Sequence, residues 1–267
     1  MTWLPMVIAS WMIYSFPLSE PTQDKANLPS AETLVQRILE NQEGDTVSEE
    51  RSYHKLALLK EFKKDGSLKR KTEREYRFSK AGDKWESTLL SINGVKATEK
   101  ERKKEAAKSA TMKRQFRSTK RSRNRGKNDI GAPLSREITD TFDWKIIGRT
   151  NILNRPAVQL AFTPSNSESA KALREGLLGK VLGSIHGVVM MDEESAQIAS
   201  VQIQLFKPFS FGWFGAIGSL SHLHIDLVRE RLSSGSWVQK KSFTQLKGRR
   251  LFSSFSFENE EIYSKYQ

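Results

Sequence analysis

The C-terminal third of the chain constrains the fold most, because apolar and polar residues alternate there over several long segments. Residues 199–205 and 222–227 each place aliphatic side chains at every second position, with serine, glutamine, histidine or aspartate between them. This period of two is typical of strands with one dry face. Weaker alternation follows over residues 236–246 and 251–257. Consecutive strands without helical segments between them predict an antiparallel meander.

The preceding segments predict more strands and two amphipathic helices. At 267 residues the chain can bury a sizeable core in one domain. Ser30 is a good N-cap for a helix that ends at Gly44, and residues 168–183 have apolar residues at helical spacing. A hairpin with an Asp-Gly turn is expected over residues 51–78. Further strands are expected over residues 85–92, 142–149 and 155–163.

An apolar run at the N-terminus is typical of an export signal. Residues 4–18 are apolar apart from two serines and a tyrosine hydroxyl, which is too short for a comfortable transmembrane helix. We therefore expect a signal peptide over residues 1–19 and a linker over residues 20–29. An uncleaved membrane anchor and a plain N-terminal helix are the alternatives.

The formal net charge of +13 is concentrated in one segment. Fourteen lysines and arginines lie between Lys96 and Lys127, opposed by three glutamates, and Thr98 with Glu101 forms a capping box. A basic helical insertion is therefore expected at about residues 95–130. It is either a solvated helix followed by a loop or a surface that docks on anionic lipid or an acidic partner. The predicted docking residues are Arg114, Arg117, Lys120, Arg121, Arg123, Arg125 and Lys127. Nucleic acid is a disfavoured partner, because no aromatic residues interleave these charges.

Residue types that perform chemistry are scarce. The absence of cysteine excludes disulfides and thiolate ligands, and no phosphate-binding glycine motif or nucleophile elbow occurs. His222, His224 and Asp226 point to one side of one strand and could hold a divalent metal, but that side also reads as a solvated strand face. We therefore expect no enzyme activity, no metal and no cofactor.

Two segments resemble the outer-membrane lipoprotein-sorting (LolA-like) family, especially its larger bacterial relatives. The stretch from Asn154 to Leu160 is similar to that family's turn and strand before the middle helix, and the stretch from His186 to Asp192 is similar to its strand ending in an aspartate turn. The resemblance implies an α+β, mainly β fold. A strongly curved antiparallel sheet, close to a half-barrel, would carry helices across its concave face. Residues 30–267 would form a single lipid-binding domain.

The same resemblance implies a periplasmic carrier that shields the acyl chains of a lipid or lipoprotein in an apolar cavity. The side chains expected to line the cavity are Val201, Ile203, Leu205, Leu223, Ile225 and Leu227 from the strands and Leu173, Leu177 and Val181 from the covering helix. Trp213 and Phe214, in a glycine-rich aromatic connection, would lie at its mouth, although this connection could equally fill one end of the core.

Two other functions remain open from the sequence. A non-transporting envelope sensor or scaffold would use the same fold with a packed interior, and an envelope protein would be its partner. An intracellular nucleic-acid-binding protein would keep its N-terminus and bind DNA with a steep salt dependence.

Overall fold

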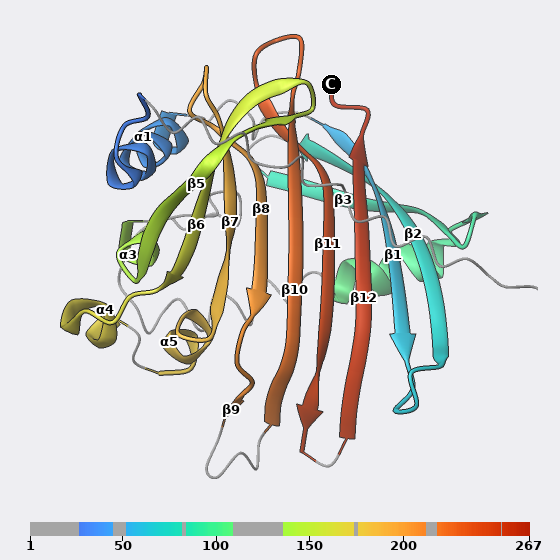
Figure 1. Ribbon diagram of the computed structural model, residues 1–267. Coiled ribbons are helices and arrows are strands. Elements are labelled where there is room, and N and C mark those ends of the chain that lie inside the picture. The colour runs from blue at the N-terminus through green and yellow to red at the C-terminus, as the bar shows by residue number, and fades with distance from the viewer. Residues whose placement is uncertain are drawn as a thin grey trace, which may run out of the picture.

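Twelve strands form one antiparallel sheet, which is curved and unclosed (Figure 1). The computed structural model describes residues 27–44, 52–81, 84–108, 136–173, 176–211, 218–251 and 253–267. The expected signal peptide lies outside these residues, as does most of the linker. The strands are β1 (Tyr53–Phe62), β2 (Leu68–Ala81), β3 (Lys84–Ile92), β4 (Val95–Lys96), β5 (Phe142–Ile152), β6 (Arg155–Pro164), β7 (Ile185–Asp192), β8 (Ile198–Leu205), β9 (Phe209–Phe211), β10 (Gly218–Arg231), β11 (Trp237–Arg250) and β12 (Ser253–Ser264).

The order of the strands is β4-β3-β2-β1-β12-β11-β10-β8-β7-β6-β5, with β9 paired to β10. The meander expected in the C-terminal third is therefore confirmed, because β7, β8, β10, β11 and β12 are successive neighbours. The N-terminal hairpin then joins the far side of the meander, where Leu56 of β1 pairs with Ile262 of β12. Within the described residues, β4 and β5 are the two edges of the sheet.

Five helical segments accompany the sheet: α1 (Ala31–Gly44), residues 99–108, α3 (Arg136–Thr139), α4 (Glu168–Leu173) and α5 (Gly176–Leu182). Both expected caps are present. Ser30 Oγ accepts a hydrogen bond from the Thr33 amide at 3.2 Å, and the Glu101 carboxylate accepts one from the Thr98 amide at 2.8 Å. No helix among the described residues is long and apolar enough to cross a bilayer.

Helix is confirmed over two stretches of the segment expected to be helical at residues 168–183. The structure gives α4 and α5, and residues 174–175 between them are not described. Two glycines, Gly176 and Gly179, lie in the second helix, and a glycine costs about 1 kcal/mol relative to alanine inside a helix. The apolar spacing was therefore a correct indication of helix in both stretches.

One row of directly paired residues crosses eight neighbouring strands and shows how the inner face of the sheet is built. Directly paired residues project from the same face of a sheet. From β6 to β2, the row contains Leu160, Val189, Val201, Leu227, Ser242, Glu261, Ala57 and Arg74. The large aliphatic residues of this row stop at Leu227 of β10, whereas in a neighbouring row Leu223 is followed by Leu246 and Phe257. We call the inner face of β5–β8 the covered half, and the inner face of β10–β12, β1 and β2 the open half.

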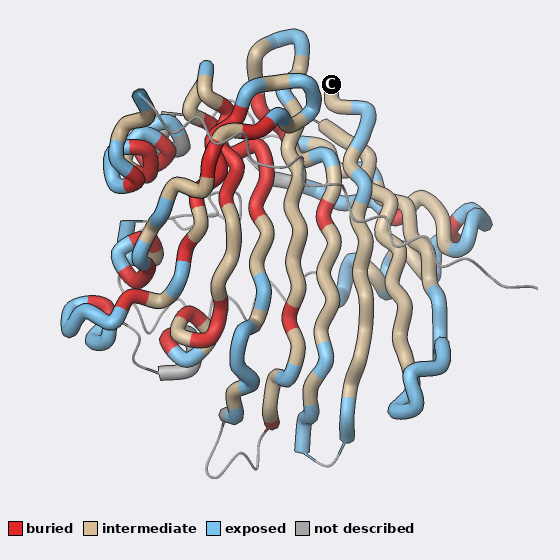
Figure 2. Tube along the Cα trace, in the orientation of Figure 1, coloured by how far each residue is buried: buried red, intermediate tan, exposed pale blue. Residues whose placement is uncertain are grey.

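The covered half packs against α1. Leu34 and Ile38 of this helix are buried in one cluster with Leu160, Val189 and Ile198 of the sheet. Figure 2 shows buried segments concentrated in α1 and in β5–β8, whereas most of β10, β11, β12 and β1 is only partly buried. The hydrophobic core of the domain is therefore off centre, under one half of the sheet.

A helix also approaches the open half, through a polar contact. The Tyr76 hydroxyl donates a hydrogen bond to Glu105 Oε1 at 3.0 Å, and Tyr76 lies two residues along β2 from Arg74 of the row. The helix over residues 99–108 therefore lies on the same face of the sheet as α1. This arrangement confirms the expected fold class, a curved antiparallel sheet with helices across its concave face.

Candidate functional site

An apolar strip runs along the boundary between the two halves. It consists of Leu220, Leu223, Ile225 and Leu227 on β10 and Val201, Ile203 and Leu205 on β8. Ile225 pairs with Ile203 and Leu227 with Val201, so the two strands present their aliphatic side chains side by side. Leu223 and Val201 are buried, whereas Ile225, Leu227 and Leu205 keep part of their surface exposed. We call this strip the apolar track.

The apolar track is long enough for an acyl chain. Seven residues separate Leu220 from Leu227, which corresponds to about 23 Å at about 3.3 Å per residue. One leaflet of a bilayer's hydrocarbon core is about 15 Å thick, so a lipid chain of ordinary length could lie along the track. Burial of each methylene would contribute about 0.8 kcal/mol.

The six strand residues predicted to line a cavity all lie on the apolar track. Val181 of α5 packs against the same cluster. Leu173 and Leu177 belong to α4 and α5, but their side chains lie outside the described residues, as do Trp213 and Phe214. The structure thus brings seven of the predicted residues together.

The polar side of the open half begins next to the track. On β1 and β12, Lys55 Nζ lies 2.9 Å from Glu261 Oε1, and each side chain is 20% exposed. Glu261 also accepts hydrogen bonds from Tyr263 at 2.6 Å and from Ser242 at 3.3 Å. Lys55 Nζ further lies 5.4 Å from the centre of the Phe78 ring. This inner polar cluster satisfies its own charges and bounds the apolar track on the side of β11.

Burial controls the ionisation of the inner polar cluster. Burial opposes ionisation of Glu261, but the charge of Lys55 and the hydrogen bond from Tyr263 outweigh it, so the pKa of Glu261 lies below its usual value. Burial, with the charge of Glu261, raises the pKa of Tyr53 to about 12. Burial and Glu105 likewise raise the pKa of Tyr76 to about 12. These phenols are therefore neutral hydrogen-bonding groups at physiological pH.

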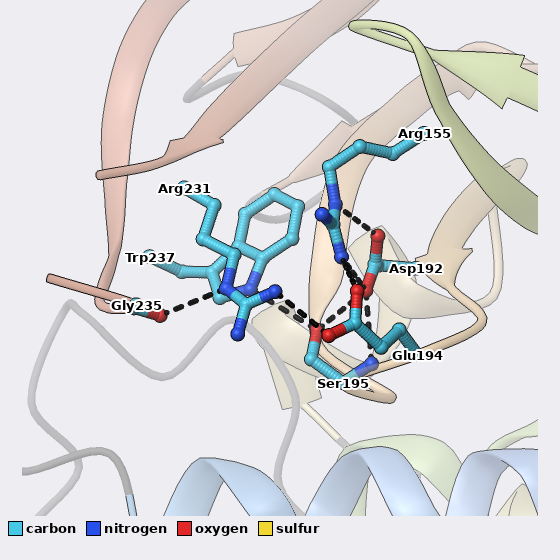
Figure 3. Close-up of polar contacts among 7 residues, drawn as sticks. All are labelled: Arg155, Asp192, Glu194, Ser195, Arg231, Gly235 and Trp237. Carbon is cyan, nitrogen blue, oxygen red and sulfur yellow. Dashed lines mark hydrogen bonds and ion pairs between the residues drawn. The ribbon is translucent and has the colours of Figure 1, made fainter. Parts of the chain in front are cut away.

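A second set of charged residues, the rim cluster, lies at one end of the sheet, where β6 begins, β7 ends and β10 turns into β11 (Figure 3). Arg155 binds the fully buried Asp192 in a bidentate pair, with Nε 2.6 Å from Oδ2 and Nη2 3.0 Å from Oδ1. Ser195 donates to Asp192 through both its amide and its hydroxyl. Glu194 bridges Arg155 and Arg231.

The rim cluster has a structural role. Trp237 Nε1 donates to Ser195 Oγ at 3.1 Å, so both oxygens of Asp192 and the serine hydroxyl have partners. Burial opposes ionisation of Asp192, but the hydrogen bonds from Arg155 and Ser195 outweigh it and hold the pKa of this carboxyl below its usual value. A carboxylate so fully paired is neither a nucleophile nor a general base. The cluster instead joins the two segments that carry the sequence resemblance.

The histidine and aspartate considered as metal ligands lie on the outer face. His224 Nε2 is 2.7 Å from Asp226 Oδ2, and His222 Nε2 is 2.6 Å from Gln245 Oε1. No group of three metal-binding side chains occurs among the residues that the structure describes. The seven basic residues predicted to dock on anionic surfaces, Arg114, Arg117, Lys120, Arg121, Arg123, Arg125 and Lys127, lie outside those residues.

Sequence reasoning missed the inner polar cluster. Lys55 and Glu261 are 206 positions apart, and only the pairing of β1 with β12 brings them together. Lys55 lies in an expected hairpin arm, and nothing in the local pattern distinguishes it from the solvated lysines of the same arm. Leu220 and Leu246, which also pack against the core, had a weaker signal because β-bulges interrupt the pairing of β10 with β11.

The sequence matches no known family model and no curated protein. In fold it is similar to solved structures of low sequence identity. A DUF1329 family protein from Desulfovibrio piger is 8% identical, with a TM-score of 0.34 over 90% of this chain and 93% of that one. A domain assigned to outer membrane lipoprotein sorting from Vibrio parahaemolyticus is 10% identical, with a TM-score of 0.32 over 89% and 92%.

A LolA superfamily protein from Nitrosomonas europaea is 7% identical, with a TM-score of 0.26 over 90% of this chain and 94% of that one. The family named from the sequence is therefore among the structures that this chain is similar to. At these identities and TM-scores the likeness assigns no role to any residue of this chain.

Proposed function

We propose that the protein is a periplasmic carrier that binds an acyl chain of a lipid or lipoprotein along the apolar track. The observation that supports this proposal is the partly exposed aliphatic surface of Ile225, Leu227 and Leu205 on the inner face of an unclosed sheet. Such a surface gains free energy when an apolar ligand covers it. In this proposal residues 1–19 are the export signal, residues 30–267 form the single lipid-binding domain, and no reaction is catalysed.

Two variants on one strand test the site. Replacing Ile225 and Leu227 with glutamine places amides on the apolar track, whereas Val228→Gln changes the outer face of the same strand. An unpaired buried amide costs about 1–3 kcal/mol, so we expect uptake of a fluorescent fatty acid to weaken at least about tenfold in the first variant and hardly at all in the second. Equal losses in both variants would contradict the proposed site.

Native cargo distinguishes the carrier from the scaffold. Protein expressed with its N-terminal segment is purified and extracted with organic solvent, and the extract is analysed by mass spectrometry. A stoichiometric phospholipid or acylated peptide supports the carrier. An empty protein that also takes up no fatty acid would instead fit a scaffold whose interior is packed.

The basic segment contributes membrane recruitment in this proposal. Replacing the basic residues between Arg117 and Lys127 with glutamine should weaken binding to anionic vesicles, because each lysine or arginine near an anionic surface contributes about 1 kcal/mol. Binding to neutral vesicles should not change. If the wild-type protein binds neutral and anionic vesicles equally, this part of the proposal is wrong.

A further inference from the structure

Three lysines line a shallow pocket of about 370 Å³ at the end of the sheet where α5 approaches β9. Lys171 comes from α4, Lys180 from α5, and Lys207 from the connection between β8 and β9. All three side chains are exposed, and Phe209 forms part of the wall. The pocket therefore combines a concentrated positive charge with one aromatic surface.

The positive charge of the pocket is only weakly neutralised by Glu168, the carboxylate that pairs with Lys171. Lys171 Nζ lies 2.7 Å from Glu168 Oε1, but the Glu168 side chain is 88% exposed. An exposed ion pair of this kind is worth little, so Lys171 can exchange this partner for a ligand at small cost. Lys207 Nζ lies 5.3 Å from the centre of the Phe206 ring, a contact that leaves its hydrogen-bond donors available.

The backbone around the pocket has its own partners. At the end of α5, the carbonyl oxygens of Gly179, Lys180 and Val181 accept hydrogen bonds from the Gly183 amide, the Ser184 hydroxyl and the Ser184 amide, at 2.8, 2.8 and 2.9 Å. These carbonyls are engaged in the turn, which reduces their repulsion of an anion. The lysine ammonium groups are thus the main polar contacts that the pocket offers to a ligand.

The pocket adjoins one end of the apolar track. Phe209 pairs directly with Leu220, so the pocket wall and the first residue of the track project from the same face. The Phe206 amide donates to the Ser184 carbonyl at 3.0 Å, which holds the end of β8 against α5. A ligand in the pocket would therefore have apolar surface directly beside it.

We propose that this pocket binds the anionic, phosphate-bearing headgroup of a lipid whose acyl chain lies along the apolar track. The inference rests on the proposed function and specifies its ligand class. Lysine binds phosphate as a compact point charge without demanding a fixed orientation, which suits a shallow pocket. The opposite polar boundary, the inner polar cluster, is already neutralised by the pairing of Lys55 with Glu261 and offers no comparable net charge.

Titration calorimetry with short-chain, monomeric lipids tests the headgroup pocket. The ligands are dihexanoylphosphatidylglycerol, uncharged dihexanoylglycerol, and inorganic phosphate alone. The variant Lys171→Gln/Lys180→Gln/Lys207→Gln is compared with a control, Lys69→Gln/Lys71→Gln/Lys247→Gln, which removes the same charge from exposed lysines outside the pocket. We expect the pocket variant to lose at least about tenfold in affinity for the anionic lipid and to keep its affinity for the uncharged one.

A single substitution tests the same pocket in the opposite direction. Glu168→Gln removes the carboxylate that competes for Lys171, so affinity for the anionic lipid should rise about twofold or more, with no change for dihexanoylglycerol. A fall in affinity would contradict the proposed role of Lys171.

The outcomes separate the pocket from the proposed function. If the control variant loses as much affinity as the pocket variant, the headgroup proposal is wrong and the carrier proposal stands. If inorganic phosphate binds as tightly as the anionic lipid, the acyl chains add no affinity, and the pocket is a phosphate site that does not select a lipid. If dihexanoylglycerol fails to bind while the anionic lipid binds through the three lysines, the apolar track is wrong and the pocket stands.

Discussion

In the row that crosses eight strands, the paired residues of the covered half are buried aliphatics, whereas those beyond β10 in the open half are Ser242, Glu261, Ala57 and Arg74. Both halves belong to the same sheet and have the same antiparallel pairing, so the backbone does not distinguish them. The difference lies in what covers them, because α1 packs tightly on one half and the other is approached through the contact of Tyr76 with Glu105. We infer that the covered half supplies most of the folding free energy and leaves the open half free to adapt to a ligand.

The largest expected difference between the halves concerns their buried carboxylates. Asp192→Ala should lower the free energy of unfolding by about 3–5 kcal/mol, because Asp192 is fully buried and its removal leaves Arg155 and both donors of Ser195 without their buried partner. Glu261→Ala should cost less, about 1–3 kcal/mol, since the Glu261 side chain is 20% exposed and water can replace part of its interaction with Lys55. Urea denaturation measures both values. A greater loss for Glu261→Ala would reverse the assignment of stability to the covered half.

Two glycines that lie against phenylalanine rings, one in each half, allow the rigidity of the halves to be compared. A Cβ at Gly187 would lie 1.9 Å from the Gln202 carbonyl oxygen and 2.6 Å from Phe162 Cζ; a Cβ at Gly248 would lie 2.3 Å from the Ser219 oxygen and 2.7 Å from Phe255 Cζ. Gly187→Ala should therefore cost about 3 kcal/mol or more, and Gly248→Ala less, about 2 kcal/mol, since its contacts are longer and the Phe255 ring is partly exposed whereas Phe162 is buried. Thermal unfolding of the two variants provides the test, and equal losses would show that the halves are equally rigid.

The tyrosines predict an alkaline weakness confined to the open half. The pKa of Tyr53 and that of Tyr76 are raised to about 12, and burial also raises those of Tyr263 and Tyr266. A raised phenol pKa stabilises the fold below pH 10, and this contribution is lost as the pH rises from about 10 through the folded-state value, because the unfolded chain then ionises more readily. Amide hydrogen exchange on a mutant with Tyr53→Phe should show slower opening of β1 and β12 at pH 10–11 than in the wild type, with β6 and β7 unchanged.

At low pH, in contrast, both halves are expected to lose stability. The pKa values of Asp192 and Glu261 are both lowered, so each carboxylate stabilises the fold above its unfolded-state pKa of about 4 and loses this effect as the pH falls through the folded-state value. For the tyrosines, the contradicting result is at high pH: if β6 and β7 of the covered half lost their amide-exchange protection before β1 and β12, the alkaline prediction would be wrong.

The smallest expected effects come from the helix caps. Ser30→Ala and Thr98→Ala each remove a side-chain oxygen that accepts a hydrogen bond from an amide of the first helical turn, a cap worth about 1 kcal/mol. Because α1 is part of the core cluster, Ser30→Ala should lower the midpoint of global unfolding. Thr98→Ala should leave that midpoint almost unchanged and accelerate amide exchange only in residues 99–108. A global effect of equal size would mean that this helix covers its half as firmly as α1 covers the other.

Local patterns in the sequence were sufficient to predict most of the fold and the strand residues of the apolar track in the candidate site. Period-two alternation identified β8, β10 and β12, and it placed Ile203 and Ile225 on one face before their pairing was known. Turn and cap residues acted as expected, since Gly66 has a φ of +84° and Thr98 forms the capping box with Glu101. These features depend on neighbouring residues alone, which is why they can be read from the chain.

The features that the sequence did not reveal depend on long-range pairing. The register between β1 and β12 joins residues about 200 positions apart, and a change of one residue would turn Lys55 to the outer face. The lysines of the pocket come from three different elements, so their proximity follows from the packing of α5 against the end of the sheet and from no local pattern.

An unclosed sheet carries a hazard that a closed barrel does not, because free strand edges can pair with other molecules and initiate aggregation. The edges seen in the described residues carry features that oppose such pairing. β4 is two residues long and pairs only with the end of β3, and the rest of β3 presents the exposed charge of Glu86 at that edge. At the other edge, β5 carries a bulge between Ile146 and Gly148 and exposes Asp143 and Lys145. The protein can thus keep its sheet open for a ligand and remain a poor template for its own copies.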